Sequence, residues 1–306
     1  PPRSTLFPYT TLFRSENLFD KYFFQPASGD AGGALGTALF LWYQFLDNPR
    51  QADEVHDFQE GSLLGPKFSD EEIVRYLKSI DARFTSYDDR ESLLDRVVQL
   101  ILQEKVIGFF QGRLEFGPRA LGCRSILGDA RSPKMQSTMN IKIKFREGFR
   151  PFAPIVMEEH AFEYFDLKDP SPYMLRVGHV QPERRIQLTP EQQKLWGIEK
   201  LNVPRSDIPA VTHVDYSARV QTVDKGRYPV LHRLLEKFHE KTGCATLVNT
   251  SFNVRGEPIV CTPQNAFQCF ANTHIDALVL EHQLLLKEDQ PKSGNNEKYL
   301  SQFKLD

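Results

Sequence analysis

Four cationic side chains crowd into the stretch KIKFREGFRPFAP at residues 142–154: Lys142, Lys144, Arg146 and Arg150. The window from Arg113 to Arg150 holds nine Lys or Arg against three acidic residues, a formal +6, which leaves −8 on the rest of a chain of net charge −2. A near-neutral protein that segregates positive charge in this way either binds an anion or has a solvated basic face. Charge alone leaves both interpretations open.

The residues around these cations favour an anion pocket. A helix is predicted from Ser132 as N-cap and Pro133 as its first residue. Lys144 falls on a different face of this helix from the apolar stripe, and Arg150 is predicted to be extended because it precedes Pro151. Rigid apolar walls lower the local dielectric and so strengthen contacts between charges. A solvated basic face does not need such walls. The stripe predicted to be buried is Met135, Met139 and Ile143.

Two further segments have residue types suited to a phosphate or nucleotide site. In FGPRALG, the Gly-Pro-Arg turn places Arg119 at the start of a predicted short helix, and a helix N-terminus with a guanidinium suits phosphate. No P-loop or dinucleotide-binding motif occurs in this region. In VNTSFNVRGEPI, small polar residues stand at the end of a predicted strand and just after it. They either line a nucleotide site or form an ordinary Asx or Ser/Thr turn. These polar residues are Asn249, Thr250, Ser251, Asn253 and Arg255.

Alternating helical and strand patterns after residue 90 predict a mixed α/β (α+β) fold. The helix predicted at 229–243 ends in Gly, and the segment 210–223 alternates like a long strand pair, with His213 and Asp215 on one face. The remaining predicted strands are 106–112, 125–129, 152–157, 172–180, 244–251 and 276–286. The remaining predicted helices are 91–103, 132–144 and 263–273.

The N-terminal part has a different character. Residues 5–15, TLFPYTTLFRS, resemble a translated sequencing adapter, so residues 1–15 are excluded from fold reasoning. A short strand is predicted at 20–27 and a buried helix at Ala31–Leu46, followed by a linker at 47–69 and a helix capped by Ser69. The polar tail at 288–306 is expected to be frayed.

Composition narrows the class of protein. Hydrophobic residues make up 40% and charged residues 25% of the chain, as in globular proteins. No apolar run is long enough to span a bilayer. The four cysteines are scattered, which argues against a zinc ribbon or disulfide framework and predicts a cytoplasmic protein.

Four motifs, in order, carry a family resemblance: QGRLEFGPRALGCRSIL, KIKFREGFRPFAPIV, PAVTHVDYSARVQTV and LVNTSFNVRGEPIVCTP. Over most of residues 16–287 the chain resembles the carbamoyltransferases of the nodulation and antibiotic-tailoring type. The resemblance implies a threonylcarbamoyl-adenylate-synthase-like (YrdC-like) domain at 91–287. It also implies that residues 16–66 are the end of an actin-like ATPase domain of the tRNA threonylcarbamoyl-transfer type, joined to it by 67–90.

The resemblance also implies a reaction. Carbamoyl phosphate and ATP would give carbamoyl-adenylate, with Mg²⁺ accompanying ATP, and the carbamoyl group would pass to a hydroxyl of a small sugar-like or antibiotic-like acceptor. Arg119, Lys144 and Arg150 would hold the phosphates, and Arg219 would add a further phosphate contact. His213 is a candidate for contact with substrate. The residues expected to line the nucleotide are Asn249, Thr250, Ser251, Asn253 and Arg255.

The family's second site is expected to be incomplete in this sequence. The resemblance assigns Asp30 as a metal ligand, with Gly29, Gly32 and Gly33 allowing the backbone to approach phosphate. The other ligands of the family's Fe²⁺ or similar metal are histidines upstream of this sequence, and one carboxylate does not hold a catalytic metal alone. Cys123 also departs from the family, which has Asn there; a structural role is expected for it.

Two other functions remain as alternatives. One is a threonylcarbamoyl-adenylate-type enzyme with another substrate. The other is a basic RNA-binding module, against which stands the lack of aromatic residues interleaved as a stacking platform among the cations. The sequence names neither the acceptor nor the oligomeric state, and it is compatible with a homodimer.

Overall fold

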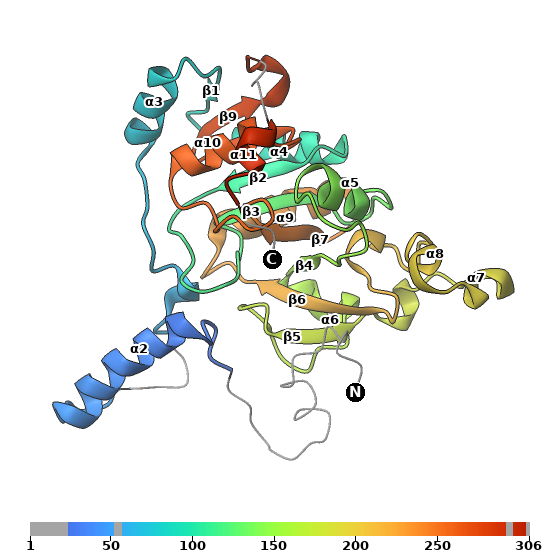
Figure 1. Cartoon of the computed structure of the whole chain (residues 1–306). Helices are drawn as coiled ribbons and strands as arrows, with labels where there is room; N and C mark the ends of the chain where they lie inside the picture. The colour runs from blue at the N-terminus through green and yellow to red at the C-terminus, as the bar shows by residue number, and fades with distance from the viewer. Residues whose placement is uncertain (1–23, 52–56, 292–295, 304–306) are drawn as a thin grey trace.

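The computed structural model describes residues 24–51, 57–291 and 296–303. A nine-stranded mixed sheet runs through it in the order β1-β9-β8-β2-β3-β7-β4-β6-β5 (Figure 1). The coarse prediction of a mixed α/β fold is therefore confirmed. The strands are β1 (Thr85–Ser86), β2 (Ile107–Phe110), β3 (Arg124–Asp129), β4 (Ala153–Met157), β5 (Arg176–His179), β6 (Ser217–Val223), β7 (Thr246–Ser251), β8 (Ala277–Leu280) and β9 (Gln283–Leu286).

Helices α4 (Arg90–Leu102), α9 (Pro229–Thr242) and α10 (Pro263–Ala271) pack against the sheet. Helices α4 and α9 contact each other, and α9 also contacts β4 and β7, while α10 lies against β2 and β8. Gly243 ends α9 in a left-handed conformation (φ 70°), as the sequence predicts. The α-helices are α2 (Asp30–Phe40), α3 (Asp70–Ser79), α4 (Arg90–Leu102), α5 (Met135–Lys142), α6 (Ala161–Tyr164), α7 (Pro190–Lys194), α8 (Gly197–Leu201), α9 (Pro229–Thr242), α10 (Pro263–Ala271) and α11 (Asn296–Leu300).

The middle strands of the sheet place polar residues on one face. Asn249 of β7 pairs in register with Ala153 of β4, and Arg219 of β6 pairs with Val177 of β5. Directly paired residues in a sheet point to the same side, as do residues two apart along a strand. Because Asn249 Nδ2 also bonds Gln221 of β6, Asn249, Arg219 and the small Ala153 share one face. This face positions the site described below.

Some local predictions are confirmed and others are wrong. Ser69 caps α3 in a capping box with Glu72. Ser132 does not cap α5, which begins at Met135 with Lys134 in the N-cap position and no side-chain cap, although its predicted apolar stripe is buried. No helix follows Arg119.

Two predicted strands divide differently. Of 210–223, only β6 is a strand; a 3₁₀ turn, Pro209–Val211, precedes it, and Tyr216 has a φ of 65° that breaks the extended run. The segment 276–286 is a hairpin of β8 and β9, turning at Glu281 (φ 49°). In the tail, predicted to fray, α11 instead docks, with Tyr299 only 6% exposed.

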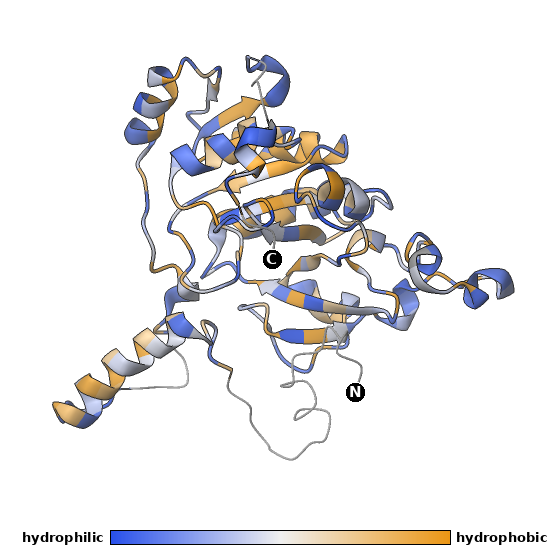
Figure 2. Ribbon diagram, viewed as in Figure 1, coloured by the Kyte–Doolittle hydropathy of each residue, from blue (hydrophilic) through white to orange (hydrophobic). Residues whose placement is uncertain are grey.

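The N-terminal part differs most from its prediction. The described residues of the strand predicted at 20–27 are irregular or in a turn, while 20–23 lie outside the described residues. A helix does occupy the next segment, as α2 and the π-helical turn Leu41–Phe45, but it has no buried residue. It projects from the rest of the molecule, with apolar residues along its outer end (Figure 2). The prediction of a buried helix is wrong: among the described residues most of the large apolar side chains along it are exposed, Phe40 by 63% and Phe45 by 75%.

None of the helices in the described ranges combines the length and apolarity that crossing a membrane requires.

Candidate functional site

Among the cations expected to hold phosphate, Lys144 is the most deeply buried. It follows α5, is 3% exposed, and reaches the end of β7. Its Nζ donates to the backbone oxygens of Ser251 and Asn253, to Asn253 Oδ1 at 2.7 Å and to Ser251 Oγ at 3.3 Å. Burial, reinforced by the charge of Arg146, lowers the pKa of Lys144 to about 7. The structure thus brings together Lys144, Ser251 and Asn253, which lie far apart in the sequence.

Arg146 lies beside this cluster. Its Nε donates to Asn140 Oδ1 at 2.7 Å, and its guanidinium lies over the Phe152 ring at 5.1 Å. Burial and the neighbouring Arg150 lower the pKa of Arg146 to about 10. Residues 144–146 form a bend with Phe145 at a φ of 49°, so no regular period in the sequence signals that Arg146 joins Lys144. Lys142 is exposed.

The loop that bears Arg119 is held by a buried carboxylate. Glu115 Oε1 accepts hydrogen bonds from the backbone N–H groups of Leu121 and Cys123, both at 2.7 Å, and of Arg124 at 3.3 Å. The Arg124 guanidinium is fully buried over the Phe110 ring and donates to surrounding backbone carbonyls. Arg124, one of the nine cations of the basic window, is therefore a structural residue.

Asn249 supports the same loop from the sheet. Its Nδ2 donates to the backbone oxygen of Ala120 and to Gln221 Oε1, both at 3.0 Å, while Gln221 Nε2 donates to the oxygen of Leu121 at 2.6 Å. Because a backbone carbonyl only accepts, these bonds fix the orientation of both amides. Asn249 is 1% exposed, so in this structure it positions the Arg119 loop.

Arg119 and Arg219 form a pair of like charges. Arg219 extends from β6, and its Nε is buried with no hydrogen-bond partner in the part of the chain that the structure describes. Burial and the nearby charge of Arg119 lower the pKa of Arg219 to about 10. Within the described residues neither guanidinium has an ion-pair partner. Two close guanidinium groups without a carboxylate attract an anion, because an anionic ligand would relieve both the repulsion and the missing hydrogen bond.

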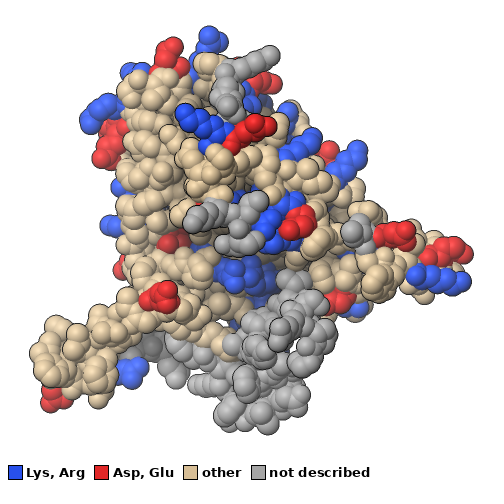
Figure 3. All heavy atoms as spheres, in the orientation of Figure 1, with Lys and Arg blue, Asp and Glu red and all other residues tan. Residues whose placement is uncertain are grey.

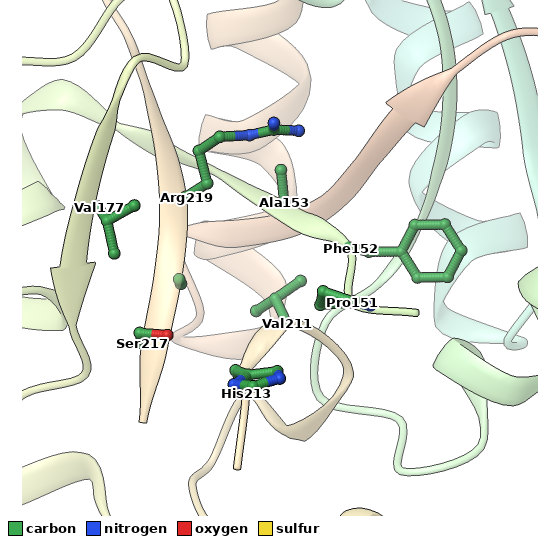
Figure 4. A pocket seen from close by; sticks show the side chains of 9 residues that line it. Pro151, Phe152, Ala153, Val177, Val211, His213, Ser217 and Arg219 are labelled. Carbon is green, nitrogen blue, oxygen red and sulfur yellow. The ribbon is translucent and has the colours of Figure 1, made fainter. Parts of the chain in front are cut away.

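A pocket opens beside Arg219 (Figure 4). Figure 4 shows Arg219 at one end and His213 at the other, with Val211 and Pro151 between them. His213 is 25% exposed along its side chain and lies 3.0 Å, through Nδ1, from Asp215 Oδ1. The His213–Asp215 pairing expected from the sequence occurs, but in a turn before β6 rather than on a strand. The full lining is Pro151, Phe152, Ala153, Val177, Val211, His213, Ser217, Ala218 and Arg219.

Arg150 and Arg255 lie outside this arrangement. Arg150, expected to hold phosphate, is exposed, and its Nε lies 3.0 Å from Glu147 Oε2. The other oxygen of Glu147 lies 3.5 Å from Arg255. One surface carboxylate therefore pairs with both cations. Thr250 points to the opposite face from Asn249, and its hydroxyl has no hydrogen bond within the described residues.

Cations nevertheless gather on this face of the molecule. Figure 3 shows Lys and Arg side chains in a hollow over the middle strands, with few acidic groups beside them. The positive charge that is concentrated in one part of the sequence is therefore matched by a concentration of cations on one face of the molecule.

Cys123 has a structural environment. Its backbone N–H closes the Glu115 turn, and its thiol is buried. Burial and the Glu115 carboxylate raise the pKa of the Cys123 thiol well above its usual range, so it is not a thiolate nucleophile.

The predicted N-terminal site lies at the start of α2. Gly29 is the N-cap with a φ of 113°, and Asp30 is the first helical residue and is exposed. A Cβ on Gly32 would lie 2.4 Å from the oxygen of Ala27, whereas Gly33 faces open space. Nowhere in the described ranges do three or more metal-ligating side chains lie together. The described residues around Asp30 therefore do not supply the set of ligands that a catalytic metal requires.

A family model described as the carbamoyltransferase C-terminus matches residues 98–287 of this chain. An uncharacterised protein of Synechocystis sp. is 53% identical over 95% of this chain and 47% of its own length. The nodulation protein NolNO of Sinorhizobium fredii is 35% identical over 90% of this chain and 37% of its own. The 3'-hydroxymethylcephem-O-carbamoyltransferase of Streptomyces clavuligerus is 32% identical over 79% of this chain and 39% of its own length.

A solved structure is also similar in part. Full-length HypF, in a phosphate- and nucleotide-bound form, gives a TM-score of 0.40 at 16% identity, covering 68% of this chain and 22% of HypF. This similarity is too low to support an argument about the site.

The structure is that of an α/β protein. A pair of cations, Arg119 and Arg219, and a pocket beside Arg219 lie at its central strands. The chain belongs to the carbamoyltransferase family defined by that C-terminal region. The resemblance seen in the sequence motifs is thereby confirmed. The chain spans less than half the length of the three relatives described above.

Proposed function

We propose that this chain forms carbamoyl-adenylate from carbamoyl phosphate and ATP, for transfer to a hydroxyl of a small sugar-like or antibiotic-like molecule. The observation that carries the proposal is the pair Arg119 and Arg219, which has no carboxylate partner among the described residues and in which Arg219 Nε donates a hydrogen bond to none of them. The cephem O-carbamoyltransferase relative supports carbamoyl transfer to oxygen. A YrdC-like domain at 91–287 and the end of an actin-like domain at 16–66 belong to the same proposal.

The first half-reaction consists of two balanced steps. Water converts carbamoyl phosphate to carbamate and phosphate. A carbamate oxygen then forms a bond to the α-phosphorus of ATP while the bond to the leaving pyrophosphate breaks. Charge spreads over the phosphoryl oxygens, so catalysis depends on positioning and on cations. Mg²⁺ would accompany ATP as part of the substrate.

The described residues suit particular tasks in these steps. Arg119 and Arg219 would hold phosphoryl oxygens at the pocket end, and a ligand oxygen would complete Arg219 Nε. Lys144 would donate from the end of β7 once a ligand oxygen raises its proton affinity, with Ser251 and Asn253 keeping it in place. Glu115 and Asn249 act indirectly, by fixing the Arg119 loop.

Pyrophosphate release from ATP, with and without carbamoyl phosphate, tests the proposal. Release should require carbamoyl phosphate and should fall about 100-fold or more in Arg219→Met, because a buried charge-assisted contact contributes about 1.5–3 kcal/mol and the transition state uses more than one. Arg150→Met is the matched control: an exposed, ion-paired cation whose loss should leave release within about threefold. Release that does not depend on carbamoyl phosphate, or that survives Arg219→Met, would contradict the proposal.

A further inference from the structure

Glu257 closes the turn that carries Asn253, one of the residues that hold Lys144. Glu257 Oε2 accepts from the backbone N–H of Val254 at 2.8 Å, and the backbone oxygen of Glu257 accepts from Asn253 Nδ2 at 2.6 Å. Because a backbone oxygen only accepts, the Asn253 amide must turn its Oδ1 toward Lys144 Nζ, which donates to it at 2.7 Å. Glu257 therefore sets the orientation of an amide that holds the ammonium group.

The other carboxylate oxygen of Glu257 is bound by the C-terminal helix. Tyr299 of α11 donates from its hydroxyl to Glu257 Oε1 at 2.6 Å. The side chain of Tyr299 is 6% exposed, and its ring packs edge-on against Phe303, with 5.3 Å between the ring centroids. Helix α11 lies beside α10 (Figure 1), close enough for the Tyr299 hydroxyl to interact with the Cys269 thiol of α10. The hydroxyl of a buried tyrosine thus ties the C-terminal helix to the turn that holds Lys144.

Glu257 also acts on the charge of Lys144. The two side chains form no ion pair within the described residues, but the carboxylate partly offsets the effects of burial and of Arg146, which lower the pKa of Lys144. Burial raises the pKa of Glu257, while the hydrogen bonds from Tyr299 and Val254 lower it and favour the ionised carboxylate. Cys269, which also lies near Lys144, remains a neutral thiol because burial raises its pKa. Glu257 is therefore the nearby group that supplies negative charge.

We propose that Tyr299 is a positioning residue for the proposed reaction: it fixes Glu257, Glu257 fixes the turn at 253–257, and this turn fixes Lys144. The inference rests on the proposed function and adds to it a requirement for the C-terminal helix. A helix that only covered apolar surface would need the ring of Tyr299 and not its hydroxyl. The hydroxyl instead donates to the carboxylate that orders the turn, so its effect on the reaction passes through Lys144.

A double-mutant cycle on carbamoyl phosphate-dependent pyrophosphate release tests the inference. Tyr299→Phe keeps the ring and should lower release about tenfold, because a hydrogen bond to a charged group is lost. In a Lys144→Met background the same change should lower release by less than about twofold, since residues that act through one group are not additive. Tyr164→Phe is the matched control. Tyr164 is also buried, and its hydroxyl accepts from the backbone N–H of Ala245 at the opposite end of β7, so its loss should change release by less than about twofold in both backgrounds.

Two further measurements need neither nucleotide nor reaction. Amide hydrogen exchange of residues 251–257 should rise about tenfold in Tyr299→Phe and stay unchanged in Tyr164→Phe. Glu257→Gln removes the negative charge and should lower the folded pKa of Lys144 below about 7. The rise of stability with pH in urea unfolding, measured against the double variant Glu257→Gln/Lys144→Met, should then begin at a lower pH than in the unmodified protein.

Each contrary outcome has a distinct meaning. If Tyr299→Phe leaves both release and exchange unchanged, or lowers release equally in the two backgrounds, Tyr299 does not act through Lys144 and the inference is overturned. Carbamoyl phosphate-dependent release by the unmodified protein would then leave the proposed function standing. If instead the unmodified protein releases no pyrophosphate, the proposed function fails. Faster exchange at residues 251–257 in Tyr299→Phe would still support the part of the inference in which Tyr299 holds the Lys144 turn.

Discussion

The Nζ of Lys144 lies 2.7 Å from Oδ1 of Asn253, and the ammonium group is enclosed by oxygens of a strand end. Its other acceptors are backbone and hydroxyl oxygens, so within the described residues no carboxylate forms an ion pair with it. Four acceptors surround a group that can donate three hydrogens. Lys144 is therefore held in place by neutral dipoles, and among the described residues no carboxylate balances its charge.

This enclosure makes stability depend on pH. The folded pKa of Lys144 is about 7 and the ordinary value is 10.5. Between these values the unfolded chain holds a proton that the folded protein releases, so stability rises with pH across that window. The penalty for burying the charge is fully present below about pH 7. Relative to Lys144→Met, the unmodified protein should gain stability from pH 7 to 10, with a slope approaching about 1.4 kcal/mol per pH unit, in urea unfolding.

Lys142→Met is the matched control, because Lys142 is exposed at the end of α5, the helix that Lys144 follows. Its stability should run parallel to that of the unmodified protein over the same pH range. A difference between the unmodified protein and Lys144→Met that stays constant with pH would show that the Lys144 pKa is not lowered.

Glu115 and Arg124 form the second interaction that can be tested by stability. Glu115→Ala should destabilise the protein by about 3–5 kcal/mol, because it removes three hydrogen bonds to one loop and leaves Arg124 with an uncompensated buried charge. Glu115→Gln should cost distinctly less, since the oxygen that accepts these bonds is kept and Oε2 has no partner to lose. Urea unfolding of both variants measures the difference. Equal losses would mean that the charge of Glu115, not its hydrogen bonds, holds the loop.

The sequence predicts those features that depend on local pattern. The strands β2, β3, β4 and β7 and the Gly-capped helix α9 follow from periodicity and capping, which neighbouring residues determine. The segment before β6 was predicted as strand because residues 210–216 alternate. The positive φ of Tyr216 comes from the turn that also forms the Asp215 hydrogen bonds, and alternation does not reveal it.

Which cations are ion-paired, which are buried and which lack a counter-ion depends on partners distant in sequence. The resemblance implied phosphate contacts for both Arg150 and Arg219, but Glu147 lies within reach of Arg150, whereas none of the described acidic residues pairs with Arg219. Arg124 resembles its neighbours in sequence, yet only the folded loop surrounds it with carbonyl oxygens. Helix α2 was predicted to be buried because its residues are mostly apolar. Apolar composition favours burial, but it does not reveal whether another element packs against the helix, and none of its residues is buried.

A close approach at the start of α2 gives a third prediction. A Cβ at position 32 would lie 2.4 Å from the backbone oxygen of Ala27, which is itself fully buried. Gly32→Ala should therefore displace the turn before α2 and raise amide hydrogen exchange in the first turns of the helix by about tenfold or more. Gly36→Ala in the same helix faces open space and should slow exchange, because Ala favours a helix by about 1 kcal/mol over Gly. Similar exchange in the two variants would show that the 27–32 contact does not order the helix.

The exposed end of this helix gives the last prediction. Trp42 and Phe45 are 53% and 75% exposed, within a run of large apolar side chains that no described element covers. Such a patch binds hydrophobic dyes and promotes self-association. Changing both residues to Lys should reduce fluorescence of bound anilinonaphthalene sulfonate severalfold and shift light scattering at high concentration toward the monomer mass. Gln44→Lys adds a positive charge in the same turn without removing apolar surface, so it should change dye binding little. If Gln44→Lys reduces dye binding as much as the double variant, charge and not apolar exposure governs association at this surface.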